Sequence, residues 1–305
     1  MKLAVWGATG HVGKALTSEL VKRGVSLDIF VRDTAKGCEF LHKERLNNIG
    51  VFTITDFDAE GYNGVINCIG IGSPDIIAQY PQRIFQITEE FDTLLIKNAI
   101  KYPKCVFVNI SSGAVYGTDF ENPASKQTIS GFSPNELNSN KYYGMAKLYS
   151  ETKHRANAES SIIDLRMFAF FSRFIDIDTR YFMTEICQSI LNKTVLKTSQ
   201  NDFTRDFIHP FDLTEMVMRC VSTGGNAAYD LYSAAPVTKW DIIHYFEEAF
   251  GLRYALETAL ASPTGEKNNY YSVFHSGGEI GYQPRYTSLE SLSDELHQLI
   301  SEAKG

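Results

Sequence analysis

Tyr143 and Lys147 are four positions apart in this 305-residue chain, and together they could move a proton. On a helix, residues with this spacing share a face. A phenol has a reference pKa of about 10, too high for easy proton exchange at neutral pH, but a nearby ammonium group favours the phenolate and lowers that pKa. Tyr143 could then donate a proton to a ketone oxygen as a hydride reaches the carbon, or accept the proton in the reverse direction.

A serine at the end of a predicted strand is the third candidate. The apolar run at residues 105–110 is typical of a strand, and Ser111 and Ser112 follow it directly. A hydroxyl group at Ser112 would hold the same oxygen that receives the proton. The predicted catalytic residues for this interconversion of a carbonyl and an alcohol are therefore Ser112, Tyr143 and Lys147.

The start of the chain predicts a dinucleotide site. Residues 2–6 form a short, mostly apolar run typical of a buried parallel strand, three glycines at a spacing of three follow, and residues 14–21 carry apolar side chains at helical spacing. Glycines in this context allow a tight turn, a close approach of the backbone to a pyrophosphate and close packing of helix on strand, and the N-terminal end of the helix favours the anion. The predicted cofactor-binding residues of this turn are Gly7, Thr9, Gly10, His11, Val12 and Gly13.

The second predicted strand, residues 25–31, bears on which cofactor binds. The end of this strand lies near the adenosine ribose in a dinucleotide fold. An arginine there accommodates a 2′-phosphate, so Arg32 favours NADP. The neighbouring Asp33 could instead accept a hydrogen bond from a ribose 2′-hydroxyl group, so NAD is the alternative.

Strands and helices continue to alternate through the first half of the chain. Further strands are predicted at 51–57, 64–70 and 161–168, and helices at 88–101 and 142–158. Such alternation implies right-handed crossovers and an α/β fold with a doubly wound parallel sheet, a Rossmann fold. One of these strands ends where a ligand passes, so Cys68, Ile69 and Gly70 are predicted to contact the cofactor.

The pattern changes beyond residue 168. Residues 118–140 are predicted to form a surface loop, and residues 170–201 are aromatic and less regular. A helix at 212–221, a strand at 229–233 and a helix at 239–250 follow. We predict a dinucleotide-binding Rossmann domain over 1–170, joined again by about 205–235, and a smaller, discontinuous C-terminal α/β substrate domain over 171–305.

Composition excludes several classes of protein. A net charge of −7 and a pI of about 5.6 lack the basic clustering of a nucleic-acid-binding protein, and no apolar run is long enough to span a membrane. The chain enters a strand at once, leaving no room for a signal peptide, and five cysteines without a CxxC pair are typical of reduced thiols. The histidines have no metal-ligand spacing. We expect a cytoplasmic homodimer that binds no metal, nucleic acid or membrane.

Four segments, in this order, resemble the extended short-chain dehydrogenase/reductase family, which includes NAD-dependent nucleotide-sugar epimerases, dehydratases and ketoreductases. They are GATGHVG at 7–13, SSGAVYG at 111–117, YGMAK at 143–147 and RDFIHPFDL at 205–213. The sequence GYQP at 281–284, followed by SLE at 288–290, is similar to the closing motif of the family.

The resemblance implies a Rossmann domain and a smaller C-terminal domain, with a nucleotide sugar bound in the cleft between them. It assigns the catalytic roles to Ser112, Tyr143 and Lys147. Tyr143 and Lys147 would also bind the cofactor, Lys147 at the nicotinamide ribose, and Asp56 and Phe57 would lie beside the adenine.

For the substrate, the resemblance implies contacts with Ser112, Tyr116 and Arg205. Arg205 corresponds to an arginine that binds the sugar-nucleotide diphosphate, a task suited to a bidentate guanidinium group. The chain departs from the family at Ile87 and Thr88, and at Ala169, where many members have asparagine. It also has no arginine between 262 and 275 to serve as a second diphosphate ligand.

Three functions are compatible with these observations. The first is an NADPH-dependent 4-ketoreductase acting on a nucleotide-linked sugar, which Arg32 favours. The second is an NAD-dependent nucleotide-sugar epimerase that retains its cofactor, and the third is a dinucleotide-sensing binding protein without chemistry, which would need no catalytic residues. Gly113 and Ala114 stand where dehydratases of this family carry an acid pair, which argues against elimination chemistry.

Overall fold

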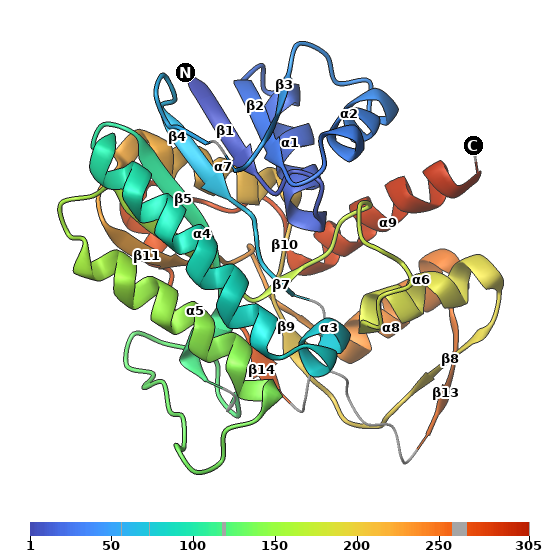
Figure 1. Cartoon of the computed structure of the whole chain (residues 1–305). Helices are drawn as coiled ribbons and strands as arrows, with labels where there is room; N and C mark the ends of the chain where they lie inside the picture. The colour runs from blue at the N-terminus through green and yellow to red at the C-terminus, as the bar shows by residue number, and fades with distance from the viewer. Residues whose placement is uncertain (56, 73, 118–119, 258–266, 305) are drawn as a thin grey trace.

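The computed structural model describes residues 1–55, 57–72, 74–117, 120–257 and 267–304 (Figure 1). Its largest element is a seven-stranded sheet with strand order β11-β6-β5-β4-β1-β2-β3, in which every neighbouring pair is parallel. The strands are β1 (Lys2–Trp6), β2 (Ser26–Val31), β3 (Gly50–Thr53), β4 (Gly64–Asn67), β5 (Val106–Ser112), β6 (Ile162–Met167) and β11 (Ala227–Asp230). This is the doubly wound order of a Rossmann fold, so the predicted fold class is confirmed.

Helices cover both faces of the sheet because side chains alternate along each buried strand. On β1, Leu3 and Val5 belong to the core shared with α1, α2 and α7, whereas Ala4 and Trp6 belong to the core shared with α4. Figure 1 shows α4 and α5 side by side over one face. These helices are α1 (His11–Lys22), α2 (Thr34–Lys43), α4 (Gln82–Lys101), α5 (Ser139–Ala156) and α7 (Pro210–Thr223).

A second group of elements packs around its own core, at the lower right of Figure 1. Phe171, Ile186, Phe246 and Leu296 are fully buried there. The helices of this group are α6 (Phe182–Asn192), α8 (Lys239–Phe250) and α9 (Ser288–Lys304). Its short strands form two sheets, β8 (Val195–Thr198) with β13 (Arg253–Leu256), and β12 (Val237–Thr238) with β9 (Thr204–Arg205) and β14 (Asn269–Tyr270).

Between these two groups the chain crosses back to the large sheet. After β9, strand β10 (Phe207–Ile208) pairs with β7 (Ala169–Phe170), α7 packs against α1, and β11 pairs with β6 at the edge of the sheet. The remaining short elements are α3 (Pro74–Gln79) and the 3₁₀ helices η1 (Gly113–Tyr116) and η2 (Ser276–Ile280). The predicted domain boundaries stay a prediction, and none of the described helices is long and apolar enough to cross a membrane.

Helices α4, α6 and α9 differ most from the predictions. The helix expected at 88–101 begins at Gln82, because Ile84 is buried against the side of α3. No helix was predicted for α6 or α9, although Leu292, Leu296 and Leu299 have helical spacing. Their apolar faces fill the second core rather than the sheet, so the alternation of strands and helices does not reveal them.

Candidate active site

Strand β5 delivers Ser112 to the carboxyl end of the sheet. The strand is buried along its whole length, and Ser112 caps η1 by accepting a hydrogen bond from the Ala114 N–H group at 3.2 Å. Glycine is needed at position 113, because a Cβ atom there would lie 2.3 Å from the ring of Phe168. The second partner of Ser112 Oγ is the hydroxyl group of Tyr270, at 3.1 Å.

Helix α5 carries Tyr143 and Lys147 and packs against η1. Lys147 is buried, and its ammonium group donates a hydrogen bond to the Ile110 carbonyl oxygen at 2.9 Å. A Cβ atom on Gly70 would lie 3.6 Å from the same ammonium group, which therefore stands beside the loop after β4. Tyr143 lies close enough to Tyr270 for charge on one phenol to raise the pKa of the other. The three residues predicted to be catalytic thus gather at the carboxyl end of the sheet.

The glycine turn has the shape and polarity that a pyrophosphate requires. Gly7 has a φ of +71°, and a Cβ atom on Gly13 would lie 2.3 Å from the Gly7 carbonyl oxygen, so the turn and the packing of α1 on it both depend on glycine. Gly10 caps α1 without any side-chain hydrogen bond. The first amide groups of the helix, with Thr9 and Val12 beside them, are therefore available to an anion. These residues fit a dinucleotide.

His11 links this turn to the segment that follows β7. Its Nε2 atom accepts a hydrogen bond from the Ser172 N–H group at 3.1 Å, and its ring lies 5.0 Å from that of Phe170. Burial lowers the pKa of His11 to about 4, with a smaller contribution from the charge of Lys14. The imidazole is therefore neutral at physiological pH, and the positive potential here comes from the helix and not from this side chain.

The loop after β4 lies against the glycine turn, as its predicted role in cofactor binding requires. A Cβ atom on Gly7 would lie 2.9 Å from the side chain of Ile69, and the Cys68 N–H group donates to the Trp6 carbonyl oxygen at 3.1 Å. Burial raises the pKa of the Cys68 thiol to about 12, so this cysteine is not a nucleophile at neutral pH. Gly70 is exposed at the end of the loop.

The two residues predicted to lie beside the adenine have different outcomes. Asp56 lies outside the described residues. The Phe57 ring packs edge-to-face on Trp6 and Phe30, with 4.7 Å between ring centroids in both pairs, and is buried. Because this ring is part of the core, only the backbone of Phe57 could contact an adenine.

Arg32 and Asp33, at the end of β2, differ in their availability to a ligand. Arg32 is exposed and forms no hydrogen bond or ion pair with any described residue. Asp33 caps α2, its Oδ1 atom accepting hydrogen bonds from the Ala35 and Lys36 N–H groups at 3.0 and 3.3 Å. The guanidinium group of Arg32 is therefore available to bind a phosphate, whereas the carboxylate of Asp33 already accepts hydrogen bonds as the cap of α2.

Two half-buried cations, Arg205 and Lys267, lie together near Ser112. The Arg205 guanidinium donates to the Thr204 and Lys267 carbonyl oxygens at 2.9 and 2.7 Å. Arg205 and Lys267 lie 5.9 and 4.2 Å from the centroid of the Tyr270 ring, and neither forms an ion pair within the described part of the chain. Burial lowers the pKa of Arg205 to about 10, and burial together with the Arg205 charge lowers that of Lys267 to about 8.

This pair of cations is suited to an anion, because it is costly to withdraw charges partly from water without a partner. Lys267 was not predicted from the sequence. Residues 262–275 contain no arginine, but they contain Lys267, and a lysine can take the place of the expected second arginine.

The hydroxyl group of Tyr116 forms hydrogen bonds inside the protein. The hydroxyl donates to Asp230 at 2.9 Å and accepts from Arg166 at 2.9 Å, and its ring stacks on Phe168. Only the ring is therefore left for the predicted contact with substrate.

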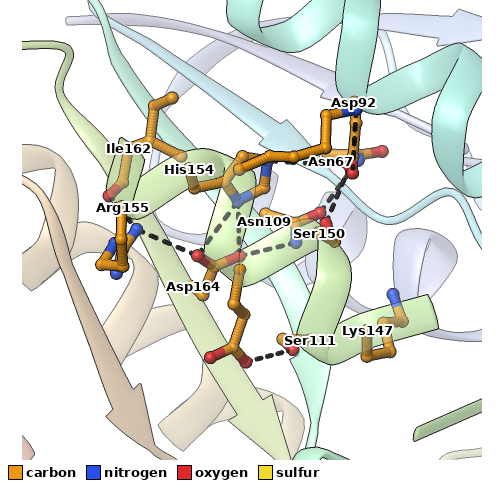
Figure 2. A network of polar contacts seen from close by, with 12 residues as sticks. Asn67, Asp92, Asn109, Ser111, Lys147, Ser150, His154, Arg155, Ile162 and Asp164 are labelled. Atoms are coloured by element: carbon orange, nitrogen blue, oxygen red, sulfur yellow. Dashed lines mark hydrogen bonds and ion pairs between the residues drawn. The ribbon is translucent and has the colours of Figure 1, made fainter. Parts of the chain in front are cut away.

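A buried polar ladder runs through the sheet beside the site (Figure 2). Asn67, Asn109 and Asp164 are partners in register on β4, β5 and β6, and the amide of Asn67 donates to Asn109 at 3.0 Å, that of Asn109 to Asp164 at 2.7 Å. Asn67 also accepts from the Ile69 N–H group at 3.0 Å, and Asp164 bonds His154 on α5 at 2.9 Å. The ladder thus ties the loop after β4 to the helix that carries Lys147.

One group of potential metal ligands exists among the described residues: His209, Asp294 and Glu295, whose ligand atoms lie within 4.8 Å of one another. The His209 Nδ1 atom accepts a hydrogen bond from the Phe211 N–H group at 3.0 Å, so the ring hydrogen is on Nε2 and faces Asp294 at 3.0 Å. The imidazole presents an N–H group to the carboxylates, an arrangement that links α7 to α9 rather than one prepared for a metal ion.

Comparisons with known proteins agree with this geometry. The model of the NAD dependent epimerase/dehydratase family matches residues 3–233, and no curated protein matches the sequence. The chain is similar to the structure of a UDP-glucose 4-epimerase with UDP-glucose from Thermotoga maritima, with a TM-score of 0.80, 16% identity and 100% of both chains covered.

Two further solved structures cover nearly all of the chain. A UDP-glucuronic acid 4-epimerase from Bacillus cereus in complex with UDP-glucuronic acid and NAD has a TM-score of 0.80, 18% identity and coverage of 99% and 100%. A dTDP-glucose 4,6-dehydratase from Bacillus anthracis in complex with NAD has a TM-score of 0.77, 14% identity and coverage of 99% and 97%. At 14–18% sequence identity, these structural similarities show a shared fold and not a shared activity.

Proposed function

Because the chain belongs to the NAD dependent epimerase/dehydratase family, we propose that it is an NAD(P)-dependent oxidoreductase of nucleotide-linked sugars, and that its reaction is the NADPH-dependent reduction of a 4-keto group. The observation that carries the proposal is the convergence of Ser112, Tyr143 and Lys147 at the carboxyl end of the sheet, with the Lys147 ammonium group beside the loop that lies against the glycine turn. A sensor without chemistry would need no such arrangement.

Each of these three residues has a distinct task. A bound nicotinamide coenzyme would supply the hydride. Tyr143 donates a proton to the ketone oxygen, and the hydroxyl group of Ser112 holds that oxygen in place. Lys147 places its ammonium group beside Gly70, where it binds the nicotinamide ribose.

The nucleotide sugar binds through its diphosphate. Arg205 and Lys267 are half-buried, close together and without acidic partners among the described residues, which supports a doubly negative group near Ser112. Guanidinium and ammonium groups both form charge-assisted hydrogen bonds with phosphate oxygens. Lys267 would then serve in place of the second arginine.

NADPH is the proposed reductant because Arg32 is exposed and has no partner among the described residues, while Asp33 is occupied as a helix cap. The second candidate is an NAD-dependent nucleotide-sugar epimerase. Two of the solved structures similar in fold are named as 4-epimerases, and one of them was solved with NAD. Ser112, Tyr143 and Lys147 would have the same roles in either reaction.

We also propose a homodimer. Phe85 on α4 and Tyr149 on α5 expose 40% and 55% of their surface although they belong to two helices that pack together. A second copy of the chain could cover such side chains. Light scattering after gel filtration would test this, and a monomer at all concentrations would contradict it.

The deciding experiment measures the fate of the cofactor. Purified protein is titrated with NADPH and NADH, and nucleotide 4-ketosugars are then screened for loss of nicotinamide absorbance. We expect one NADPH consumed per sugar reduced, with deuterium from labelled NADPH transferred to C4 of the product. Interconversion of sugars without net loss of NADPH, by protein purified with NAD bound, would support the epimerase instead.

A further inference from the structure

The hydroxyl group of Tyr270 lies 3.1 Å from Ser112 Oγ, and the reaction proposed above gives it no task. Tyr270 is on β14, 158 positions from Ser112 in the sequence. We propose that Tyr270 is a positioning residue that sets the direction in which the Ser112 hydroxyl group donates its hydrogen bond. This inference rests on the proposed function of Ser112.

The argument comes from the hydrogen-bonding capacity of the two hydroxyl groups. A serine hydroxyl group has one hydrogen to donate and can accept two hydrogen bonds. The Ala114 N–H group takes one acceptor position of Ser112 Oγ at 3.2 Å, and an amide N–H only donates, so it directs the hydrogen of Ser112 away from itself. The two hydroxyl oxygens lie 3.1 Å apart, within hydrogen-bond distance.

One of the two hydroxyl groups must therefore donate to the other. A phenol is a stronger acid than an aliphatic alcohol and so the better donor, and burial raises the pKa of Tyr270, which keeps its hydrogen in place. When Tyr270 donates, both acceptor positions of Ser112 are filled. The hydrogen of Ser112 then has no acceptor among the described residues and is left to meet the substrate oxygen.

Tyr270 is held firmly enough to perform this task. Its ring packs edge-to-face against Phe120 and Phe168, with centroids 4.7 and 5.3 Å away. Its backbone is paired in register with Arg205 on β9. Two residues later, the Ser272 hydroxyl group donates to Asp230 at 2.5 Å, which fixes this segment to the end of β11. A donor fixed in advance needs no reorganisation during the reaction.

The test is a double-mutant cycle on reduction of a nucleotide 4-ketosugar. Tyr270→Phe keeps the ring and removes only the hydroxyl group. We expect it to lower kcat about tenfold, the value of one well-placed hydrogen bond, with KM changed less than threefold. In a Ser112→Ala background the same substitution should have no further effect. Tyr271→Phe is the matched control, since no described hydrogen bond involves its hydroxyl group, and it should leave kcat unchanged.

Equal losses from Tyr270→Phe with and without Ser112 would overturn the proposal, as would an unchanged or higher kcat, which would mean that Tyr270 only obstructs the site. A second measurement does not depend on turnover. With 3-fluorotyrosine at position 270, the fluorine resonance should move on Ser112→Ala and stay in place on Ser111→Ala. An unmoved resonance overturns the contact itself, whereas a moved resonance in a protein that reduces no ketosugar overturns only the proposed function.

Discussion

A Cβ atom on Gly144 would lie 2.3 Å from the carbonyl oxygen of Ala114. Position 144 requires glycine, because at this point α5 touches the backbone of η1, the 3₁₀ helix that follows Ser112. The contact sets the distance between the helix that carries the proposed proton donor and the strand that carries its serine partner.

Gly144→Ala should push α5 away from η1 and displace Tyr143 from Ser112. We expect kcat to fall about 100-fold, as for a misplacement of about 1 Å in an active site, and stability to fall by about 1–3 kcal/mol from overpacking. Steady-state kinetics and thermal unfolding measure both effects. Gly131→Ala, where a Cβ atom would meet nothing within 4 Å, is the control; equal behaviour of the two variants would rule out this role of the contact.

Tyr143→Phe keeps the ring in the small apolar cluster of α3, α4 and α5 and removes the proposed proton donor. Activity should fall by about 10²–10⁴-fold, the usual range for a positioned acid–base group. Cofactor affinity, measured by fluorescence titration, should change little. Turnover close to that of the wild type would show that the proton comes from another group.

Arg32→Ala should weaken NADPH binding by about 10- to 150-fold, the value of one charge-assisted hydrogen bond, because the guanidinium group is exposed and free to meet the 2′-phosphate. NADH affinity should be nearly unchanged, since NADH has no such phosphate. Calorimetric titration with both cofactors is the measurement. Equal weakening of the two cofactors, or a preference of the wild type for NADH, would contradict the assignment.

Binding of a nucleoside diphosphate should depend on the charge of Lys267, whose pKa burial lowers to about 8. The ammonium group is charged below this pH and neutral above it, so UDP affinity should fall as the pH rises through 8. Lys267→Arg should remove this pH dependence. Lys267→Met should bind UDP about 10- to 100-fold more weakly at pH 7. Calorimetry with UDP that shows no effect of either substitution would place the diphosphate elsewhere.

Glu295 should make the protein less stable above neutral pH. Burial raises the pKa of this carboxyl group to about 7, so the folded protein binds the proton more tightly than the unfolded chain does. Stability from this group therefore falls as the pH rises from about 4.5 to 7 and stays low above that range. Glu295→Gln should raise Tm at pH 8 and leave it nearly unchanged at pH 4. Exposed Glu159→Gln is the control, and the same Tm change at both pH values would contradict the explanation.

Local sequence patterns determined the fold class and the members of the proposed catalytic group. The alternation of apolar runs with helical spacing specifies buried parallel strands and their crossover helices, and a glycine turn after the first strand leaves few alternatives. Spacing predicts that Tyr143 and Lys147 share a helical face and that Ser112 follows a strand, and the family resemblance joins the three residues into one catalytic group. The match to the family model confirms the resemblance that these motifs carried.

Contacts between segments far apart in the chain were decided only by the tertiary structure. The sequence places Phe57 near a predicted ligand, but packing against Trp6 and Phe30 turns its ring into the core. Tyr270 meets Ser112, and Lys267 meets Arg205, because β14 pairs with β9. The periodicity of a single segment does not predict such long-range contacts, because they depend on how two separately packed cores fit together. The lowered pKa of Lys267 likewise follows from its burial in the folded protein and not from its residue type.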